Sequence, residues 1–240
     1  MSGQFPRIGP RLLAVTEAIA SGSRVADIGS DHGRLPRLLI RSGRAVACIA
    51  TEFGAGPSAR LRASVTACPE ADRIEVRQGD GLDPLHSEDR IDGLVLSGMG
   101  AATMLSILDV SRLGALGVGW LVLQPQSGWA GLRVTLAERE WSITAERLVR
   151  DRGRFYTVMR AQAGATTPAP PQGISERDWF ELGPCLYRDR DPAAIEYWTE
   201  RSSRARARLR LARGEGIRHA RGERELADRA LAALKSPRVG

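Results

Sequence analysis

The 240-residue sequence has little of what metal-binding and secreted proteins depend on. Its three cysteines, Cys48, Cys68 and Cys185, are widely spaced and form no C-x-x-C pair. We therefore expect neither a structural disulfide nor a bound metal. No apolar run approaches the ~18–20 residues of a membrane span, and residues 1–10 lack the basic-then-apolar pattern of a signal peptide. These absences predict a soluble cytoplasmic protein with no membrane association.

The sequence also lacks the G-x-G-x-x-G turn of dinucleotide-binding dehydrogenases. In its place, an apolar run over residues 25–28 leads into Gly29-Ser30-Asp31-His32-Gly33, and a helical pattern follows from Leu35. A strand that turns into a helix in this way forms the ligand-holding corner of a doubly wound α/β sheet. Asp27 and Asp31 make the corner acidic, so it disfavours a pyrophosphate. It suits a ligand with a positive centre and no phosphates, and S-adenosylmethionine (SAM) is such a ligand.

Three further apolar runs, residues 45–50, 74–77 and 91–96, end in candidate ligand-binding residues. Glu52 lies 23 residues after Gly29, close to the spacing at which a carboxylate accepts hydrogen bonds from ribose hydroxyls. The alternative for Glu52 is a surface glutamate at a strand end. The alternative for Asp80 and Gly81, which follow the run at residues 74–77, is a plain Asp-Gly turn. We predict that the cofactor-binding residues are Asp27, Gly29, Ser30, Glu52, Phe53, Asp80, Gly81, Ser97, Gly98 and Met99.

The order of the predicted elements indicates an α/β fold. A helix is expected over residues 11–20, and residues 141–149 and 154–162 read as two strands about a polar turn at 150–153. A β-hairpin that closes an otherwise parallel sheet is typical of a Rossmann-like class I methyltransferase and argues against a dehydrogenase.

A second, smaller domain is expected after a linker rich in Pro, Gly and Ala at residues 163–173. Gly183-Pro184-Cys185-Leu186 interrupts an apolar patch there, and from Pro192 onward the pattern is helical with a break at residues 214–216. Two such helices can pair as an antiparallel, coiled-coil-like hairpin. The predicted domains are therefore 1–165 and 174–240, the second helical.

The net charge of +7 is concentrated near the end of the chain. Residues 200–240 contain 12 Lys and Arg against 5 Asp and Glu, and the remainder of the chain is balanced. Such an excess favours binding to a polyanion such as nucleic acid. The alternative is a solvated helical face, because Lys235 is the only lysine and a GC-rich genome also explains the arginines.

Several stretches together resemble the bacterial tRNA (adenine-22-N1)-methyltransferase family, a class I methyltransferase domain followed by a small helical domain. They run in the family's order: residues 26–32 with Leu35-Pro36, then Gly81-Leu82, Ser97-Gly98-Met99-Gly100, Leu123-Gln124-Pro125 and Phe180-Glu181-Leu182-Gly183-Pro184-Cys185-Leu186. The chain departs from the family's pattern at Gly33-Arg34 (usually Ala-Tyr), Ala101 (usually Gly), Gln126 (usually Asn) and Asp80 (often Asn).

The resemblance implies SAM-dependent methyl transfer to N1 of adenine in tRNA, at position 22. It makes Asp31 and His32 the candidate catalytic residues: Asp31 favours the cationic product or holds the exocyclic amine, and His32 either contacts the substrate or is a turn histidine bonded to backbone. The Asp/Asn-Pro-Pro-Tyr motif typical of adenine N6 methylation is absent, and the chain has no asparagine at all.

The expected partner is tRNA, whose backbone the second domain is expected to bind. The expected oligomeric state is a monomer or weak dimer. Three alternatives stay open at this point. The chain could methylate another RNA base, methylate a small molecule, or bind SAM and tRNA without turnover.

Overall fold

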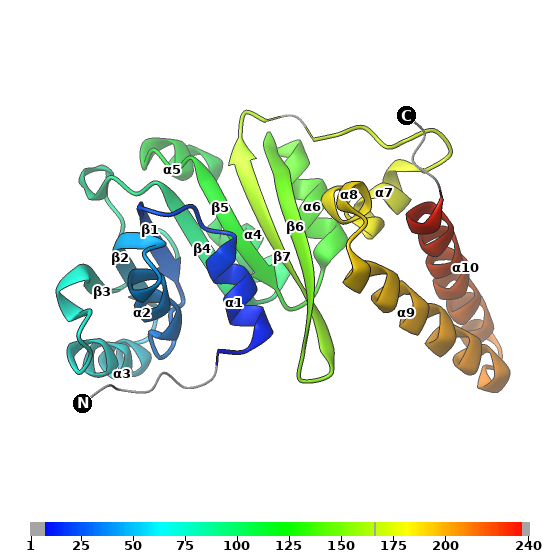
Figure 1. The fold of residues 1–240 in the computed structure, drawn as a ribbon, viewed down its shortest axis with the longest axis horizontal. Helices are drawn as coiled ribbons and strands as arrows, with labels where there is room; N and C mark the ends of the chain where they lie inside the picture. The colour runs from blue at the N-terminus through cyan, green and yellow to red at the C-terminus, as the bar shows by residue number, and fades with distance from the viewer. Residues whose placement is uncertain (1–7, 166, 237–240) are drawn as a thin grey trace. The chain divides into compact units, whose positions relative to one another are not determined.

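The centre of the molecule is one seven-stranded sheet in the order β3-β2-β1-β4-β5-β7-β6 (Figure 1). The computed structural model describes residues 8–165 and 167–236. The strands are β1 (Ser23–Ile28), β2 (Ala45–Glu52), β3 (Ile74–Gln78), β4 (Gly93–Met99), β5 (Trp120–Pro125), β6 (Trp141–Asp151) and β7 (Arg154–Ala163).

The direction of the strands decides which loops share an edge. β1 to β5 pair in parallel, whereas β7 is antiparallel to both β5 and β6. β6 therefore runs in the same direction as β5, and its carboxyl end lies at the same edge as those of β1 to β5. The predicted class I methyltransferase sheet, closed by a β-hairpin, is confirmed.

Six α-helices accompany the sheet in the described part of residues 1–167: α1 (Pro10–Glu17), α2 (Arg34–Arg41), α3 (Ala55–Thr66), α4 (Ala101–Ile107), α5 (Val110–Ala115) and α6 (Trp129–Glu138). Two short 3₁₀ turns, η1 (Ala71–Arg73) and η2 (Ser87–Asp89), precede β3 and β4. In Figure 1, α1 and α2 lie in front of the sheet, and α4 and α6 lie behind it. Helices on both faces explain why β5 is buried along its whole length.

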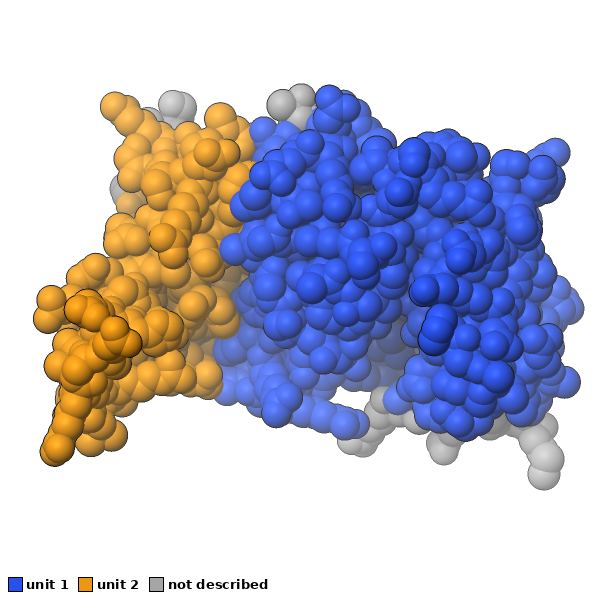
Figure 2. All heavy atoms as spheres, turned by 180° about the vertical axis from the view of Figure 1, so that it is seen from behind, with its two compact units in different colours: residues 1–167 blue, residues 168–240 orange. Residues whose placement is uncertain are grey.

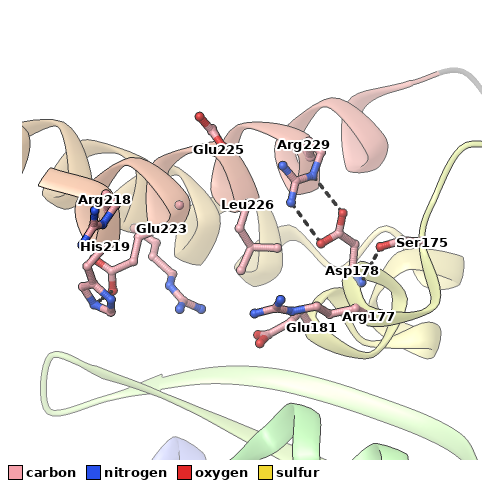
Figure 3. Close-up of a pocket in the computed structure, with 12 residues that line it drawn as sticks. Ser175, Arg177, Asp178, Glu181, Arg218, His219, Glu223, Glu225, Leu226 and Arg229 are labelled. Atoms are coloured by element: carbon pink, nitrogen blue, oxygen red, sulfur yellow. Dashed lines mark hydrogen bonds and ion pairs between the residues drawn. The ribbon is translucent and has the colours of Figure 1, made fainter. Parts of the chain in front are cut away.

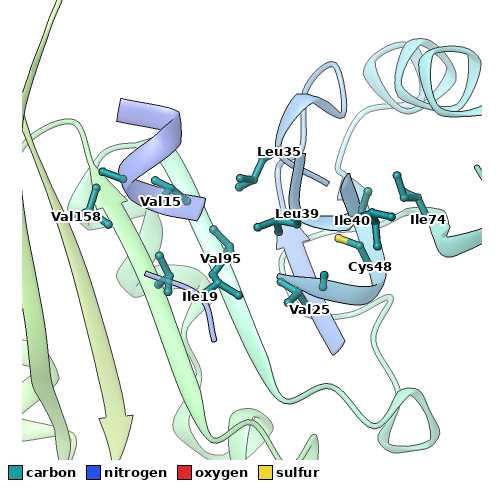
Figure 4. Close-up of a cluster of buried hydrophobic side chains, with 14 of the residues drawn as sticks. Val15, Ile19, Val25, Leu35, Leu39, Ile40, Cys48, Ile74, Val95 and Val158 are labelled. Atoms are coloured by element: carbon teal, nitrogen blue, oxygen red, sulfur yellow. The ribbon is translucent and has the colours of Figure 1, made fainter. Parts of the chain in front are cut away.

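One hydrophobic cluster joins the front helices to the sheet (Figure 4). Val15 of α1 and Leu39 of α2 are fully buried there, and they pack with Val25 of β1 and Val95 of β4. The alternation of side chains along a strand directs Val95 to this face, while Leu94 and Leu96 point to the other face and are also fully buried. Burial of this apolar surface fixes α1 and α2 against the strand ends that carry the predicted site.

The chain divides into two compact units, residues 1–167 and residues 168–240, coloured separately in Figure 2. The second unit contains α7 (Glu176–Leu182), α8 (Pro184–Asp189), α9 (Pro192–Leu211) and α10 (Glu215–Lys235). α9 and α10 pack along one another as the predicted helical pair, with Trp198, Ala205, Ala227 and Ala230 buried.

Several boundaries differ from the sequence-based expectation. Gly183-Pro184 does not only interrupt an apolar patch but starts a helix, because Gly183 takes a positive φ of 91° and Pro184 suits the first helical position. The first helix ends at Glu17 and not at residue 20, since Arg160 and Arg44 donate hydrogen bonds to the carbonyls of Ala18 and Ile19.

The strand expected over residues 91–96 instead covers Gly93–Met99. Asp92 precedes it because its carboxylate accepts a hydrogen bond from the Arg24 N–H at 2.6 Å.

No helix within the described residues combines the length and the apolar character needed to cross a membrane.

Gly93 is predicted to be essential for the packing of β4 on β5. It pairs in register with Trp120, and a Cβ at this position would overlap the Trp120 indole ring. Gly93→Ala should therefore lower the free energy of unfolding by about 1–3 kcal/mol, the usual cost of overpacking. Gly131→Ala in α6, where a Cβ meets nothing within 4 Å, is the matched control and should be neutral or stabilising in thermal denaturation. Equal stability of the two variants would contradict this packing.

Candidate active site

A cavity of about 600 Å³ lies at the edge of the sheet where the parallel strands end. Its lining comes from the carboxyl ends of β1, β4 and β6, the segments that follow β1, β5 and β6, α1 with the residue before it, the start of α2, and β7. The lining residues are Gly9, Arg11, Leu12, Asp27, Gly29, Ser30, Asp31, His32, Arg34, Leu35, Ser97, Gly98, Gln126, Asp151, Arg152 and Tyr156. We call this cavity the strand-end pocket. It unites seven of the predicted site residues: Asp27, Gly29, Ser30, Asp31, His32, Ser97 and Gly98.

The turn between β1 and α2 lines the pocket and has an unusual backbone conformation. Gly29, Asp31 and Gly33 have positive φ angles of 76°, 52° and 66°. A Cβ on Gly29 would lie 3.3 Å from the Met99 side chain, so a larger residue there meets both strain and crowding. Ser30 closes the turn by accepting the Gly33 N–H at 2.9 Å on its carbonyl. The glycines are thus required by this geometry.

Asp27 is a buried carboxyl at the floor of the strand-end pocket. Its relative exposure is 3%, and its Oδ2 accepts a hydrogen bond from the Ser30 hydroxyl at 2.7 Å. Burial raises the pKa of Asp27 from 3.8 to about 7; the Ser30 hydrogen bond opposes this rise and the charge of Glu52 adds to it. No cationic side chain neutralises Asp27 in the described part of the chain. Such a group is poised to accept a cationic ligand.

Glu52 does not line the pocket but is bonded to its rim. Its Oε1 accepts a hydrogen bond from the Asp31 N–H at 2.5 Å. Phe53, which follows, is 71% exposed, so its ring is accessible. The Gly79 N–H donates to the Glu52 carbonyl at 3.0 Å, which places the segment of Asp80 and Gly81 beside Glu52. These residues and Met99 lie along the same strand-end edge without lining the cavity.

The exposed ends of the two candidate catalytic side chains face one another. Asp31 Oδ1 lies 3.6 Å from His32 Nε2, and both side chains are largely exposed. The His32 carbonyl accepts a hydrogen bond from the Ser64 hydroxyl at 2.9 Å, while its ring makes no hydrogen bond to backbone among the residues that the structure describes. Asp31 and His32 therefore present their side chains to the mouth of the pocket.

The sequence reasoning missed a second set of pocket residues. Arg11 Nη1 donates to Gln124 Oε1 at 3.3 Å, and the Arg11 guanidinium lies 5.2 Å from the centre of the Tyr156 ring. The fully buried Gln124 also accepts from the Ser97 hydroxyl at 3.2 Å. Gln126 donates to the Gly98 carbonyl at 2.5 Å. Only the topology, which returns β6 to the ligand edge, signals that the hairpin turn belongs to the site.

A second cavity, of about 480 Å³, lies inside the 168–240 unit (Figure 3). Asp178 of α7 forms two hydrogen bonds with the Arg229 guanidinium of α10, at 2.8 and 3.1 Å, and its backbone N–H donates a capping hydrogen bond to the Ser175 hydroxyl oxygen at 3.1 Å. Glu223 is likewise paired with Arg208 at 2.8 Å. These pairs tie the helices together, so we assign this cavity a structural role.

No group of three His, Cys, Asp or Glu side chains within residues 8–165 and 167–236 is arranged to hold a metal ion.

A family model described as tRNA (adenine(22)-N(1))-methyltransferase matches residues 25–229. The chain belongs to this family. Its members are SAM-dependent enzymes that methylate tRNA, and the family, activity class and cofactor predicted from the sequence are confirmed.

Relatives of known name and structure agree with the family match. The tRNA (adenine(22)-N(1))-methyltransferase of Bacillus subtilis (strain 168) is 31% identical over 194 residues, 81% of each chain. The crystal structure of the B. subtilis m1A22 tRNA methyltransferase covers 94% of this chain and 99% of its own, with 27% identity and a TM-score of 0.79. A Streptococcus pneumoniae candidate tRNA (m1A22) methyltransferase, solved with S-adenosyl-L-methionine, covers 94% and 100%, with 25% identity and a TM-score of 0.80.

The buried carboxyl of Asp27 is predicted to destabilise the ligand-free protein at neutral pH. Its folded pKa of about 7 exceeds the ordinary 3.8, so the folded chain keeps a proton that the unfolded chain releases. Stability therefore falls as pH rises from about 4 and the full cost is present above about pH 7. Asp27→Asn should gain stability over wild type between pH 5 and pH 8 by on the order of 2 kcal/mol. Thermal denaturation of the wild type and of Asp27→Asn at pH 5 and at pH 8 measures this gain, with Asp31→Asn as the control. If the stability difference between Asp27→Asn and the wild type is the same at the two pH values, the burial of an unpaired carboxyl is contradicted.

Proposed function

We propose that this chain transfers the methyl group of SAM to N1 of adenine 22 in tRNA, and that the strand-end pocket is where the two substrates meet. The observation that carries the proposal is the buried, unneutralised Asp27 carboxyl beneath the Gly29–Gly33 turn. A carboxyl in that place is suited to the α-ammonium of an amino-acid ligand, and the family match covers this turn. A cavity of about 600 Å³ is large enough for the methionine end of SAM and an adenine base.

The residues at the strand ends each bind a different part of the cofactor. Asp27, Gly29 and Ser30, which line the pocket together, hold the methionine end. Glu52 accepts hydrogen bonds from the ribose hydroxyls, and the exposed Phe53 ring covers the adenine. Asp80 and Gly81 meet the adenine amine, and Ser97, Gly98 and Met99 line the junction with the acceptor base. SAM supplies an electrophilic methyl group on its sulfonium.

The acceptor needs placement more than it needs a base. Unprotonated adenine N1 carries an in-plane lone pair, so the protein must hold this nitrogen in line with the methyl group, an effect worth up to ~7–11 kcal/mol in favourable cases. N1 lies on the Watson–Crick edge, and a paired base must first leave its stack. Asp31, fixed by the bond between its N–H and Glu52, is placed to hold the exocyclic amine and to favour the cationic product. His32 lies beside it at the mouth and contacts the substrate.

The 168–240 unit is proposed to bind the tRNA backbone. Arg210, Arg213 and Arg221, near the end of the α9–α10 pair, are exposed and have no carboxylate partner in the described residues. Leu211 beside them is 85% exposed. Arginines that are not neutralised by neighbouring acids suit phosphate contacts, which position an RNA without reading its sequence. Because tRNA is the acceptor, we place the reaction in the cytoplasm. The oligomeric state, a monomer or a weak dimer, stays a prediction.

The proposed reaction predicts incorporation of one methyl group per tRNA. Tritiated SAM, the full chain and an unmodified tRNA transcript with adenine at position 22 should yield labelled N1-methyladenosine on nucleoside analysis. The same transcript with guanine at position 22 should stay unlabelled, because guanine N1 carries a proton and has no free lone pair. Labelling of both transcripts, or a different labelled nucleoside, would contradict the assigned acceptor.

A substitution of Asp31 tests the proposed binding of the acceptor adenine. Asp31→Ala should lower kcat by about 10²-fold, the lower end of what a positioned carboxylate contributes, while the KM for SAM changes little. Asp83→Ala, an exposed acidic residue outside the strand-end pocket, is the matched control. A kcat for Asp31→Ala equal to that of the control would remove Asp31 from the catalytic residues.

A further inference from the structure

The turn between β6 and β7 carries a dense cluster of arginines at the mouth of the strand-end pocket. Arg150, Arg152 and Arg154 occur within five positions, and all three are exposed. Arg152 itself lines the pocket. We call residues 150–154 the arginine turn. The topology places it there, because β6 runs parallel to β5 and so ends at the ligand edge of the sheet.

The conformation of the arginine turn directs these side chains outward. Arg152 has a φ of 49° and is followed by Gly153 with a φ of 77°, the pair of positive angles that favours a tight hairpin turn. The Arg150 guanidinium stacks over the Phe155 ring, 5.2 Å from its centre, which fixes one arginine of the cluster. A short turn between two long paired strands is a rigid support, so the positive charges have a defined position.

The positive charge at this mouth is only partly balanced. Arg34, at the start of α2, is exposed and also lines the pocket. Neither Arg34, Arg152 nor Arg154 forms an ion pair with a carboxylate in the described part of the chain. The acidic residues that line the pocket are Asp27, which is buried, Asp31 and Asp151, whereas the exposed arginines in and beside its mouth are Arg34, Arg150, Arg152 and Arg154. The excess is local, since Arg34 and Arg152 both line the pocket.

We propose that the arginine turn and Arg34 bind the tRNA phosphates that flank the target nucleotide. The inference rests on the proposed function, because it assumes that a nucleotide of tRNA enters the strand-end pocket. A nucleotide that enters with its Watson–Crick edge first keeps its sugar and phosphates at the mouth. Guanidinium groups there hold the phosphates in two-point contacts and stabilise the nucleotide out of its stack. The catalytic unit thus has its own RNA contact, distinct from that of the 168–240 unit.

A charge-reversal pair tests the assignment. In the full-length chain, Arg152→Glu with Arg154→Glu should weaken tRNA binding about tenfold or more at moderate salt. It should also lower the slope of log Kd against log salt concentration by about 1–2, because each lost phosphate contact reduces counterion release. The Kd for SAM should stay within twofold of wild type. Arg152→Lys with Arg154→Lys keeps the charge and should keep the salt slope.

The matched control reverses two exposed arginines at the other edge of the sheet. Arg73 and Arg90 precede β3 and β4, and Arg90 has a φ of 51°, so Arg73→Glu with Arg90→Glu imposes the same charge change and the same backbone strain. An equal loss of tRNA affinity in both pairs, or none in the arginine turn, would overturn the proposal. Since binding is measured apart from turnover, a wild-type chain that binds tRNA but does not methylate adenine 22 would overturn the proposed function alone.

Discussion

The structure depends on one costly placement, a carboxyl buried at the end of the first strand. Asp27 is 3% exposed and has a pKa raised to about 7, with one hydroxyl from Ser30 as its side-chain hydrogen-bond donor. A fold under selection for stability alone would not keep an unneutralised acid there. The turn above it, the positive φ angles of Gly29 and Gly33, and the carboxylate of Glu52 beside Asp31 all serve the same corner. In the proposed function, the α-ammonium of SAM meets this carboxyl and offsets the cost.

The direction of the strands explains how distant segments meet at this corner. Parallel strands bring the residues after β1, β4 and β5 to one edge, and the antiparallel β7 lets β6 end there as well. The helix α1 adds Arg11, which is held by the buried Gln124 and stacked on Tyr156. In the proposed function, the cofactor side of the pocket is built on the first strands and the acceptor side on α1 and the hairpin. A methyl transfer that relies on alignment needs such a rigid frame on both sides.

Much of this arrangement follows from local sequence. The apolar runs ending in Gly29, Glu52 and Ser97 predict the strands and the edge where they end, because strand periodicity and glycine turns are local signals. Arg11 and Tyr156 escaped prediction, since their meeting depends on contacts between segments more than 100 residues apart and neither carries a motif. The start of α8 at Pro184 was also missed: Gly-Pro reads as a break until the positive φ of Gly183 is known. The turn at residues 150–154 has the sequence of an ordinary polar loop, and only the order of the strands places it at the pocket.

The most direct measurement is the affinity of the full-length chain for SAM as a function of pH, by calorimetry without tRNA. If the ionised Asp27 carboxyl binds the α-ammonium, affinity should increase roughly 20-fold between pH 5.5 and pH 7.5, because a group with a pKa near 7 is mostly protonated at the lower value. Binding should also release a proton, and Asp27→Asn should bind weakly without this pH dependence. An affinity that is equal at the two pH values in the wild-type chain would contradict the central role given to the buried carboxyl.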